Sequence, residues 1–188
     1  NIEQVIEEII SGNYSISERT LIEVSTSESN IQLSKLNFAL NEITLSRKNT
    51  TSMISIDTKL DNKHLNSYWA DGLIISTPTG STGYSLSCGG PIIMPDAENL
   101  VINPIAPHNL NARPLVIPDN TEIKIKVNGR EDEFLISLDS RITTLNNSNE
   151  VTIKKSPFKI KMIELENESF LITLREKLMW GKDKRNLQ

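Results

Sequence analysis

The sequence predicts a mainly β domain in which antiparallel sheets pack face to face as a β-sandwich, with one N-terminal helix and a loop-rich middle. Three observations predict this fold class. Most apolar segments alternate with polar residues at period two, and a long helical period occurs in only one segment. Seven of the eight prolines also fall between Pro78 and Pro118, which separates the strand-like segments into two groups.

The first twelve residues predict the helix. In NIEQVIEEIISG, the apolar residues Ile2, Val5, Ile6 and Ile9 recur at the spacing of one helix face. Gly12 follows as a C-terminal stop, because glycine readily adopts the left-handed conformation that ends many helices. We therefore expect an amphipathic helix over residues 1–12.

Short strands are expected on both sides of the middle third. TEIKIKV is the clearest case, with Ile123, Ile125 and Val127 on one face and charged residues on the other. Its lysines predict a solvated face and no further role. The same alternation predicts strands in TLIEVS (20–25), ISIDTKL (54–60), FLISL (134–138), VTIKK (151–155), FKIKMIEL (158–165) and SFLITL (169–174).

The middle third holds an unusual concentration of small polar residues. The segment DGLIISTPTGSTGYSLSCGGP (71–91) contains five of the eight glycines, and seven serine and threonine hydroxyls fall between Ser76 and Ser87. Backbone N–H groups beside glycine can approach an anion closely, and hydroxyls can donate to phosphate or sugar oxygens. Asp71 is an acceptor suited to a ribose hydroxyl or a carboxamide. The segment favours a nucleotide as ligand, although a glycine-rich connector between strands would have a similar composition.

Composition and motif spacing exclude several other classes. A net charge of −4 with mixed signs argues against an electrostatic nucleic-acid binder. Cys88 is the single cysteine, which excludes an internal disulfide and favours a reducing compartment. No apolar run approaches the ~20 residues of a membrane span. A P-loop is excluded because no lysine lies between residues 63 and 124, and neither His64 nor His108 is spaced for a metal. A catalytic triad through Ser81 and His108 has no support in the spacing.

Several of these segments, in this order, resemble the C-terminal half of the NAD kinase family. The resemblance is carried by Asp-Gly, Ser-Thr-Pro-Thr-Gly-Ser-Thr and Gly-Gly-Pro in 71–91, by NPIAPHNLNARPLVIP (103–118), and upstream by FALNEITLSR (38–47). ISLDSR (136–141) and LREKLMWG (174–181) also look like family segments. The resemblance runs from about Gly12 to Trp180, and it implies the family's fold and activity for this region.

The resemblance also implies a set of residues that bind NAD. Asn41 and Glu42 would be polar partners of the nucleotide, and Asp71 would contact the nicotinamide ribose or carboxamide end. Arg141 stands where the family often has a glutamine, and Trp69 stands where some relatives carry a basic residue. The residues that the resemblance assigns to NAD are Asn41, Glu42, Asp71, Thr82, Gly83, Tyr84, Ser85, Leu86, Ser87 and Arg141.

The implied reaction is phosphoryl transfer from ATP to the adenosine ribose 2′-hydroxyl of NAD, giving NADP, with Mg²⁺ or another divalent cation accompanying ATP. The family's Gly-Gly-Asp-Gly segment is absent, because Gly89-Gly90 is followed by Pro91. No catalytic or metal-ligating residue is therefore assigned here, and the general base is expected upstream. We expect residues 1–12 to connect to an N-terminal α/β domain, 13–180 to bind NAD, and 181–188 to form a polar tail.

The resemblance further implies a homodimer or homotetramer. The single cysteine, the net charge and the lack of a long apolar run predict a cytoplasmic protein with no nucleic-acid or membrane partner. Three alternatives stay open on the sequence: a nucleotide-binding or oligomerisation module without turnover, a relative of the lipid kinases, and a purely structural β-sandwich. The Thr-Pro-Thr-Gly-Ser-Thr segment argues against the lipid kinases. NAD binding without NADP formation would distinguish the module from the enzyme.

Overall fold

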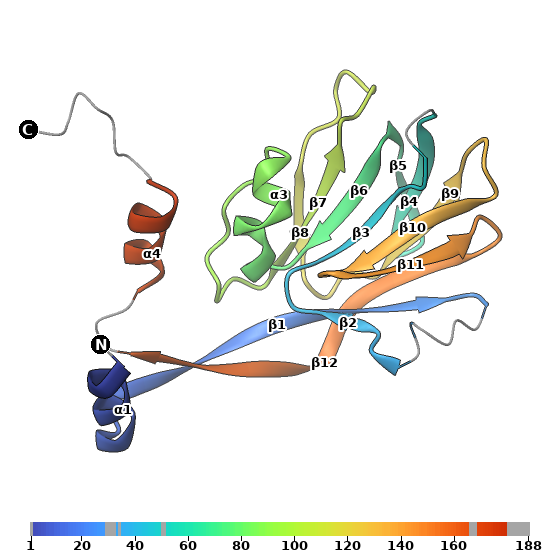
Figure 1. Cartoon of the computed structure of the whole chain (residues 1–188). Coiled ribbons are helices and arrows are strands. Elements are labelled where there is room, and N and C mark those ends of the chain that lie inside the picture. The colour runs from blue at the N-terminus through green and yellow to red at the C-terminus, as the bar shows by residue number, and fades with distance from the viewer. Residues whose placement is uncertain (1, 29–32, 34, 50–51, 166–168, 180–188) are drawn as a thin grey trace, which may run out of the picture.

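Two antiparallel sheets of six strands each form the body of the protein (Figure 1). The structure is a computed structural model that describes residues 2–28, 33, 35–49, 52–165 and 169–179. The first sheet has the order β2 (Phe38–Ala39), β1 (Tyr14–Thr26), β12 (Glu150–Leu165), β9 (Ile123–Asn128), β4 (Ile54–Leu60) and β5 (Lys63–Ala70). The second has the order β11 (Arg141–Asn146), β10 (Glu133–Leu138), β3 (Glu42–Arg47), β6 (Gly72–Ser76), β7 (Asn99–Ile105) and β8 (Leu115–Pro118).

The core lies between the two sheets, as the period-two patterns predict. In β9 the residues Ile123, Ile125 and Val127 are fully buried, while the lysines between them are partly exposed. They belong to one apolar cluster that includes Leu73 and Phe134 of the second sheet. The predicted antiparallel β-sandwich is confirmed. Its stability comes mainly from removing these aliphatic side chains from water.

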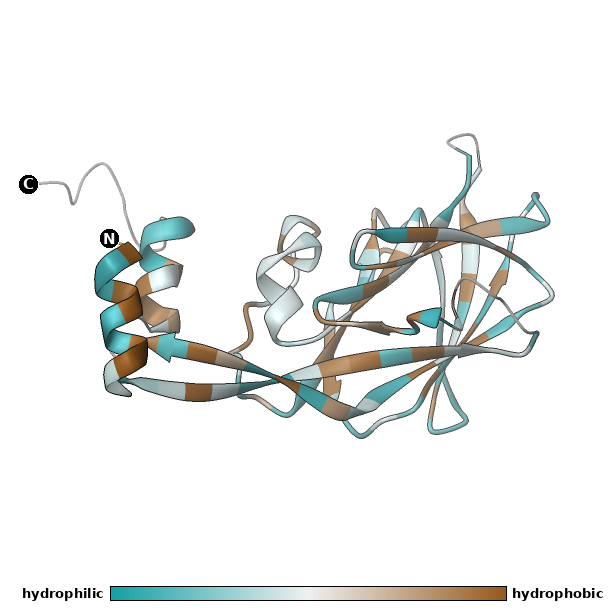
Figure 2. Cartoon of the chain, turned by 60° about the horizontal axis from the view of Figure 1, so that its bottom comes forward, coloured by the Kyte–Doolittle hydropathy of each residue, from teal (hydrophilic) through white to brown (hydrophobic). Residues whose placement is uncertain are grey.

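β1 and β12 continue past the sandwich as a twisted two-stranded arm (Figures 1 and 2). Their pairing runs from Tyr14–Leu165 to Thr26–Val151, with a bulge after Thr20. The two segments VTIKK and FKIKMIEL are thus one strand, and Pro157 lies at the bulge, where no regular ladder bond is lost.

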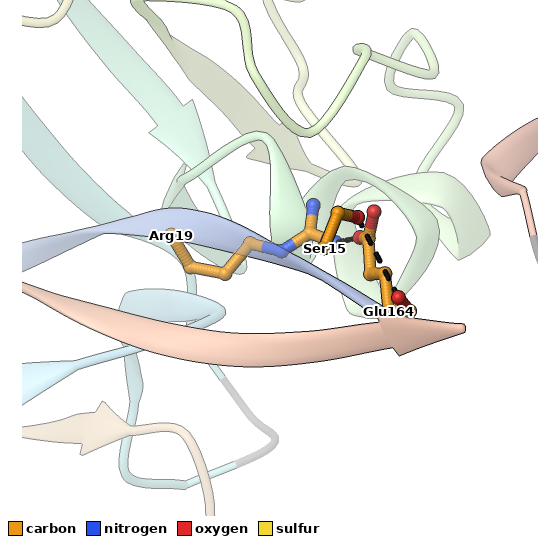
Figure 3. Close-up of polar contacts among 3 residues, drawn as sticks. All are labelled: Ser15, Arg19 and Glu164. Atoms are coloured by element: carbon orange, nitrogen blue, oxygen red, sulfur yellow. Dashed lines mark hydrogen bonds and ion pairs between the residues drawn. The ribbon is translucent and has the colours of Figure 1, made fainter. Parts of the chain in front are cut away.

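Ion pairs join the two strands of the arm, among them Glu18–Lys159 at 3.2 Å and the partly buried pair Arg19–Glu164. The Arg19 guanidinium contacts the Glu164 carboxylate, and the Ser15 hydroxyl donates to the Glu164 carbonyl oxygen at 3.5 Å (Figure 3). Arg19 is 8% exposed although it lies on a two-stranded arm. The pair therefore ties the middle of the arm to its far end, where Glu164 lies opposite Ser15.

The predicted N-terminal helix is confirmed as α1 (Ile2–Ser11), which is attached to the end of the arm. Gly12 follows it with a φ of +77°, the left-handed conformation expected of a helix stop. None of the residues of α1 is buried, and Ile2 and Ile10 are 78% and 80% exposed. Ile6 of the apolar stripe is 49% exposed, so the described residues cover the stripe only in part.

The strand expected at SFLITL is wrong, because this segment belongs to the helix α4 (Phe170–Lys177). The Ser169 hydroxyl caps the helix by accepting from the Ile172 N–H at 3.3 Å, and Arg175 and Lys177 suit the negative end of the helix dipole. A short apolar run fits both the strand period and the helix period. Here the Ser169 cap and the basic residues of the last turn favour the helix. The predicted polar tail at 181–188 lies outside the described residues.

The middle third is loop-rich, as predicted, from Thr77 to Glu98, where η1 (Thr79–Thr82) and α3 (Tyr84–Ser87) are short turns of helix. Two strands nevertheless follow within the proline-rich region, β7 and β8. Pro104 lies in β7 beyond Ile102, the last residue of β7 that pairs with β8. One side of the strand is unpaired there, which is where a strand tolerates proline.

Candidate functional site

The segment rich in glycine, serine and threonine leaves β6 and turns through η1 and α3 beside the second sheet (Figure 1). Four of its hydroxyl side chains, those of Ser76, Thr77, Ser81 and Ser85, are fully buried, and the last two show how they hold the segment itself. Ser81 donates to the Pro78 carbonyl at 2.7 Å and accepts from the Ile93 N–H at 2.9 Å. Ser85 accepts from the Asn103 side-chain amide at 3.3 Å. Part of the unusual composition therefore builds the turn rather than a ligand surface.

The remaining predicted residues of this segment reach the surface to different degrees. Gly83, Tyr84 and Ser87 are exposed, whereas Thr82 and Leu86 are half-buried. Together they form the outer face of the two helical turns. This face is the part of the segment that a ligand can touch, and Ser85 lies beneath it.

The segment meets the start of β3 at Asn41. The Thr77 N–H donates to the Asn41 carbonyl at 2.9 Å, which continues the β3–β6 ladder by one bond. A Cβ atom on Gly80 would lie 2.1 Å from the same oxygen, so only glycine fits at this position. This close approach places the Gly80–Gly83 turn directly against the Asn41–Glu42 pair.

Asp139, to which the sequence assigned no role, holds this pair from the other side. Its carboxylate accepts three consecutive backbone N–H groups, from Leu40 at 3.0 Å, Asn41 at 2.8 Å and Glu42 at 3.2 Å. Asp139 has a φ of +52° in the turn between β10 and β11, a conformation that aspartate tolerates better than most residues. The turn could be inferred from the sequence, but the target of the carboxylate could not.

Glu42 carries an acceptor that lacks a donor. Its Oε2 atom is buried and accepts no hydrogen bond from the described residues. A Cβ atom on Gly83 would lie 3.5 Å from Oε2, so the carboxylate lies next to Gly83, the exposed residue of the turn. Burial, and then the nearby charge of Asp139, raise the pKa of Glu42. A ligand hydroxyl at this place would satisfy the carboxylate.

Asp71 lies at the opposite end of the same ladder. Glu42 pairs with Ser76 and Ser46 pairs with Gly72, so about four residues of strand, roughly 14 Å, separate the two ends. The Asp71 carboxylate accepts from Arg47 Nη2 at 2.9 Å. The structure therefore brings Asn41, Glu42 and Gly83 together but places Asp71 apart from them.

A cavity of about 520 Å³ adjoins Arg47 at this second end. Its wall includes Arg47, Arg130, His108, the indole of Trp69 and the apolar Met53 and Ile54. Trp69 is 58% exposed. Arginine side chains beside an exposed aromatic ring suit a planar group that carries negative charge.

Tyr84 follows Gly83 at the Glu42 end of the β3–β6 ladder and also senses the charge of Asp71 at the other end. Burial first, and then Cys88 and the charge of Asp71, raise the pKa of the Tyr84 hydroxyl, so this side chain lies within electrostatic reach of Asp71. Burial also raises the pKa of the Cys88 thiol, an effect that its hydrogen bond with Tyr84 opposes. Cys88 therefore remains a protonated, packed thiol near neutral pH rather than a nucleophile.

Arg141, which the resemblance assigned to NAD, points elsewhere in this structure. Its guanidinium donates to the carbonyls of Leu36, at 2.8 Å, and of Phe38. It also lies 5.8 Å from the centre of the Phe38 ring. These contacts tie the turn after Asp139 to the segment before β3, and the assignment to NAD stays a prediction.

The described residues contain no group of three or more His, Cys, Asp or Glu side chains that could hold a metal ion. In the same part of the chain, no helix has the length and apolar character that crossing a membrane requires. The candidate site consists of the Asn41–Glu42 pair, the Gly80–Gly83 turn, and Asp71 at the far end of the ladder.

Comparison with known proteins gives one consistent result. A family model described as the ATP-NAD kinase C-terminal domain matches residues 40–165. The NAD kinase of Flavobacterium psychrophilum is 64% identical over 186 residues, which cover 99% of this chain and 63% of that protein. The NAD kinase of Bacteroides fragilis is 44% identical over 184 residues, with 98% and 63% covered. The chain thus spans less than two thirds of the length of these curated relatives.

Solved structures share the fold. The crystal structure of yeast NADH kinase complexed with NADH aligns with a TM-score of 0.89 and 27% identity, covering all of this chain and 57% of the yeast chain. The crystal structure of an NAD kinase from Archaeoglobus fulgidus in complex with ATP aligns with a TM-score of 0.74 and 25% identity, covering 96% and 65%.

Proposed function

Because the chain belongs to the family of the ATP-NAD kinase C-terminal domain, we propose that the protein transfers a phosphoryl group from ATP to the adenosine ribose 2′-hydroxyl of NAD, giving NADP. The observation that carries the proposal is the pair Asn41–Glu42. It presents a buried carboxylate oxygen without a donor, beside the exposed residue Gly83. Ribose hydroxyls are donors of the kind that this carboxylate lacks.

In this proposal the chain holds NAD and does not supply the base. Asn41 and Glu42 bind hydroxyls of the nucleotide, and the face of Thr82, Gly83, Tyr84, Leu86 and Ser87 lines its other side. Tyr84 offers a ring to a base or to nicotinamide. Asp71 binds the nicotinamide ribose or carboxamide end, and Ser85 supports the wall from beneath.

Mg²⁺ enters the proposal as part of the ATP substrate. Phosphoryl transfer depends on positioning and on neutralising charge, and a divalent cation on the triphosphate neutralises charge. The residues described above contribute the positioning, because they hold the acceptor nucleotide at a fixed place relative to the sheet.

The test is NADP formation by the complete protein with ATP, Mg²⁺ and NAD, followed by an enzyme that accepts only NADP. We expect product with the unsubstituted protein and a large loss in Glu42→Gln and Asn41→Ala. Asp57→Asn is a matched control, because Asp57 lies on β4 of the other sheet, where it contacts Ser67 and Asn128. NAD binding without NADP formation would instead support a binding module.

We also propose that the exposed stripe of α1 packs against a further α/β domain of the full-length protein. Two facts support this: α1 buries none of its residues, and the curated relatives are longer than this chain. Ile6→Ser should lower the unfolding temperature of the complete protein and leave that of the 188-residue chain unchanged. Equal effects on both would contradict the proposal.

A homodimer or homotetramer is proposed on the resemblance alone. Sedimentation equilibrium of the complete protein measures the assembly directly. A monomer at all concentrations would contradict it.

A further inference from the structure

We propose that Asp139 is a positioning residue of this site: its carboxylate fixes the backbone of residues 40–42 and thereby aims the Asn41 and Glu42 side chains at the nucleotide. The inference rests on the proposed function, because it assumes that these two side chains bind NAD. It assigns Asp139 no contact with the ligand.

The backbone at residues 40–42 is not held by a regular ladder on this side. The pairing between β3 and β10 ends at Ile43–Leu138, and Asp139 comes next in the chain. In an extended strand, successive N–H groups point to opposite sides, so three in a row cannot bind one neighbouring strand. Here the N–H groups of Leu40, Asn41 and Glu42 converge on one carboxylate. The carboxylate therefore replaces the ladder at the bend that leads into β3.

The carbonyl groups of the same residues are bound too, those of Leu40 and Asn41 from the opposite side and that of Glu42 by Asp139 itself. The Thr77 hydroxyl donates to the Leu40 carbonyl at 2.5 Å, and the Thr77 N–H donates to the Asn41 carbonyl at 2.9 Å. The Asp139 N–H donates to the Glu42 carbonyl at 3.0 Å. The backbone of residues 40–42 is thus held at donors and acceptors alike, which fixes the direction in which each side chain leaves the backbone.

Asp139 acts on Glu42 and not on the ligand. Its two oxygens already accept three charge-assisted hydrogen bonds, so its capacity is largely used by the protein. Its charge adds to the effect of burial in raising the pKa of Glu42. Arg141, the nearby cation, is directed to the carbonyls of Leu36 and Phe38. Asp139 is therefore the charged side chain that perturbs Glu42.

Two substitutions separate the hydrogen bonds from the charge. Asp139→Asn tolerates the φ of +52° and keeps an oxygen that can accept from Asn41 and Glu42, but it removes the charge. Asp139→Gly also tolerates this φ but removes all three bonds. Asp119→Asn is the matched control: Asp119 is 5% exposed and paired with Lys155 at 2.5 Å, and it follows β8, three strands from β3.

We expect Asp139→Gly to raise the KM for NAD by about tenfold or more, with a smaller change in kcat, because three bonds to a charged acceptor are lost. Asp139→Asn should raise KM less. It should also move the acid limb of the pH profile of kcat/KM to lower pH, since one cause of the raised Glu42 pKa is gone. Asp119→Asn should change neither KM nor the profile.

Hydrogen exchange at the amides of residues 40–42 gives a second readout that does not need turnover. Faster exchange there in Asp139→Gly than in Asp119→Asn supports the positioning role. If the unsubstituted protein forms no NADP, the proposed function fails and this exchange result still decides the geometry. An unchanged KM, pH profile and exchange rate in Asp139→Gly would overturn the inference.

Discussion

The two ends of the β3–β6 ladder differ in how they are held. At the Glu42 end, backbone groups are bound on both sides by Asp139 and Thr77, and Gly80 packs directly on Asn41. At the Asp71 end, the backbone is held by ladder-type bonds to Arg47 and Ile105, both at 3.0 Å, and the ion pair of Asp71 with Arg47 adjoins a cavity of about 520 Å³. One sheet thus carries a closed end that fixes polar groups and an open end with room for a ligand. Substitutions should therefore cost more at the closed end.

The largest effect is expected from Gly80→Ala at the closed end. The new Cβ would lie 2.1 Å from the Asn41 carbonyl oxygen, and neither backbone can yield without breaking the turn. We expect a loss of about 3 kcal/mol in the free energy of unfolding, as for severe overpacking. Urea denaturation measures it.

Gly83→Ala is the matched control for this substitution. Its Cβ would lie 3.3 Å from the Gly80 carbonyl oxygen, which is tight but close to ordinary contact. The cost should be about 1 kcal/mol or less. Equal losses for both alanines would show that the close approach of Gly80 does not hold the closed end together.

Glu42→Gln should separate stability from binding. Because the folded-state pKa of Glu42 is raised above its ordinary value of 4.5, ionising this carboxyl costs the folded protein more than the unfolded chain. The protonated Glu42 carboxyl contributes to the stability of the folded protein below pH 4.5, and this contribution is lost as the pH rises through the folded-state pKa of Glu42. Glu42→Gln should therefore be more stable than the unsubstituted protein at neutral pH. Below pH 4.5, where the Glu42 carboxyl is protonated in both states, the variant should have no such advantage.

The same variant should bind NAD about tenfold more weakly, since a charge-assisted hydrogen bond is replaced by a neutral one. Denaturation at two pH values and calorimetric titration with NAD provide the two measurements. If Glu42→Gln loses stability at neutral pH, the interpretation of Glu42 as a buried acceptor without a donor is contradicted.

A moderate effect is expected from Asp71→Ala at the open end. The ion pair with Arg47 is about one quarter exposed on the arginine side and one third on the aspartate side, so its loss should cost only about 1 kcal/mol. NAD affinity should fall in addition if Asp71 binds the nicotinamide end. A double-mutant cycle with Arg47→Met isolates the pair, and a coupling as large as the cost of Gly80→Ala would remove the contrast between the two ends.

The smallest effect on stability is expected from Trp69→Arg. Trp69 is 58% exposed, so its replacement should change the free energy of unfolding by no more than about 0.5 kcal/mol. The new cation would join Arg47 and Arg130 at the cavity. Affinity for NADP should rise at low salt and return toward the original value at high salt. Marked destabilisation would show that the indole is a packed part of the wall.

The sequence was most informative where local pattern and environment agree. The alternation in TEIKIKV predicted the buried face of β9, and the helical spacing of the first residues predicted α1. It failed at SFLITL, where a run of six apolar and small residues fits a strand as well as a helix. It also gave no indication that β7 and β8 cross the proline-rich region, because an unpaired strand side is a property of the sheet and not of the segment.

The candidate site divides in the same way. Resemblance selected Asn41, Glu42 and the turn at Gly83, and the fold brings these three together. It also selected Arg141, whose guanidinium the fold directs to Leu36 and Phe38. Asp139 was present in a segment already recognised, yet its partner residues lie almost one hundred positions away.

By itself, the sequence determined the fold class, the N-terminal helix and the position of the polar segment, because each depends on the period and composition of neighbouring residues. Only the tertiary structure decided that Asp139 holds residues 40–42, that Gly80 must be glycine, and that Asp71 stands at the other end of the ladder from Glu42. These depend on strand order and register, which bring distant residues into contact, and no local pattern specifies those contacts.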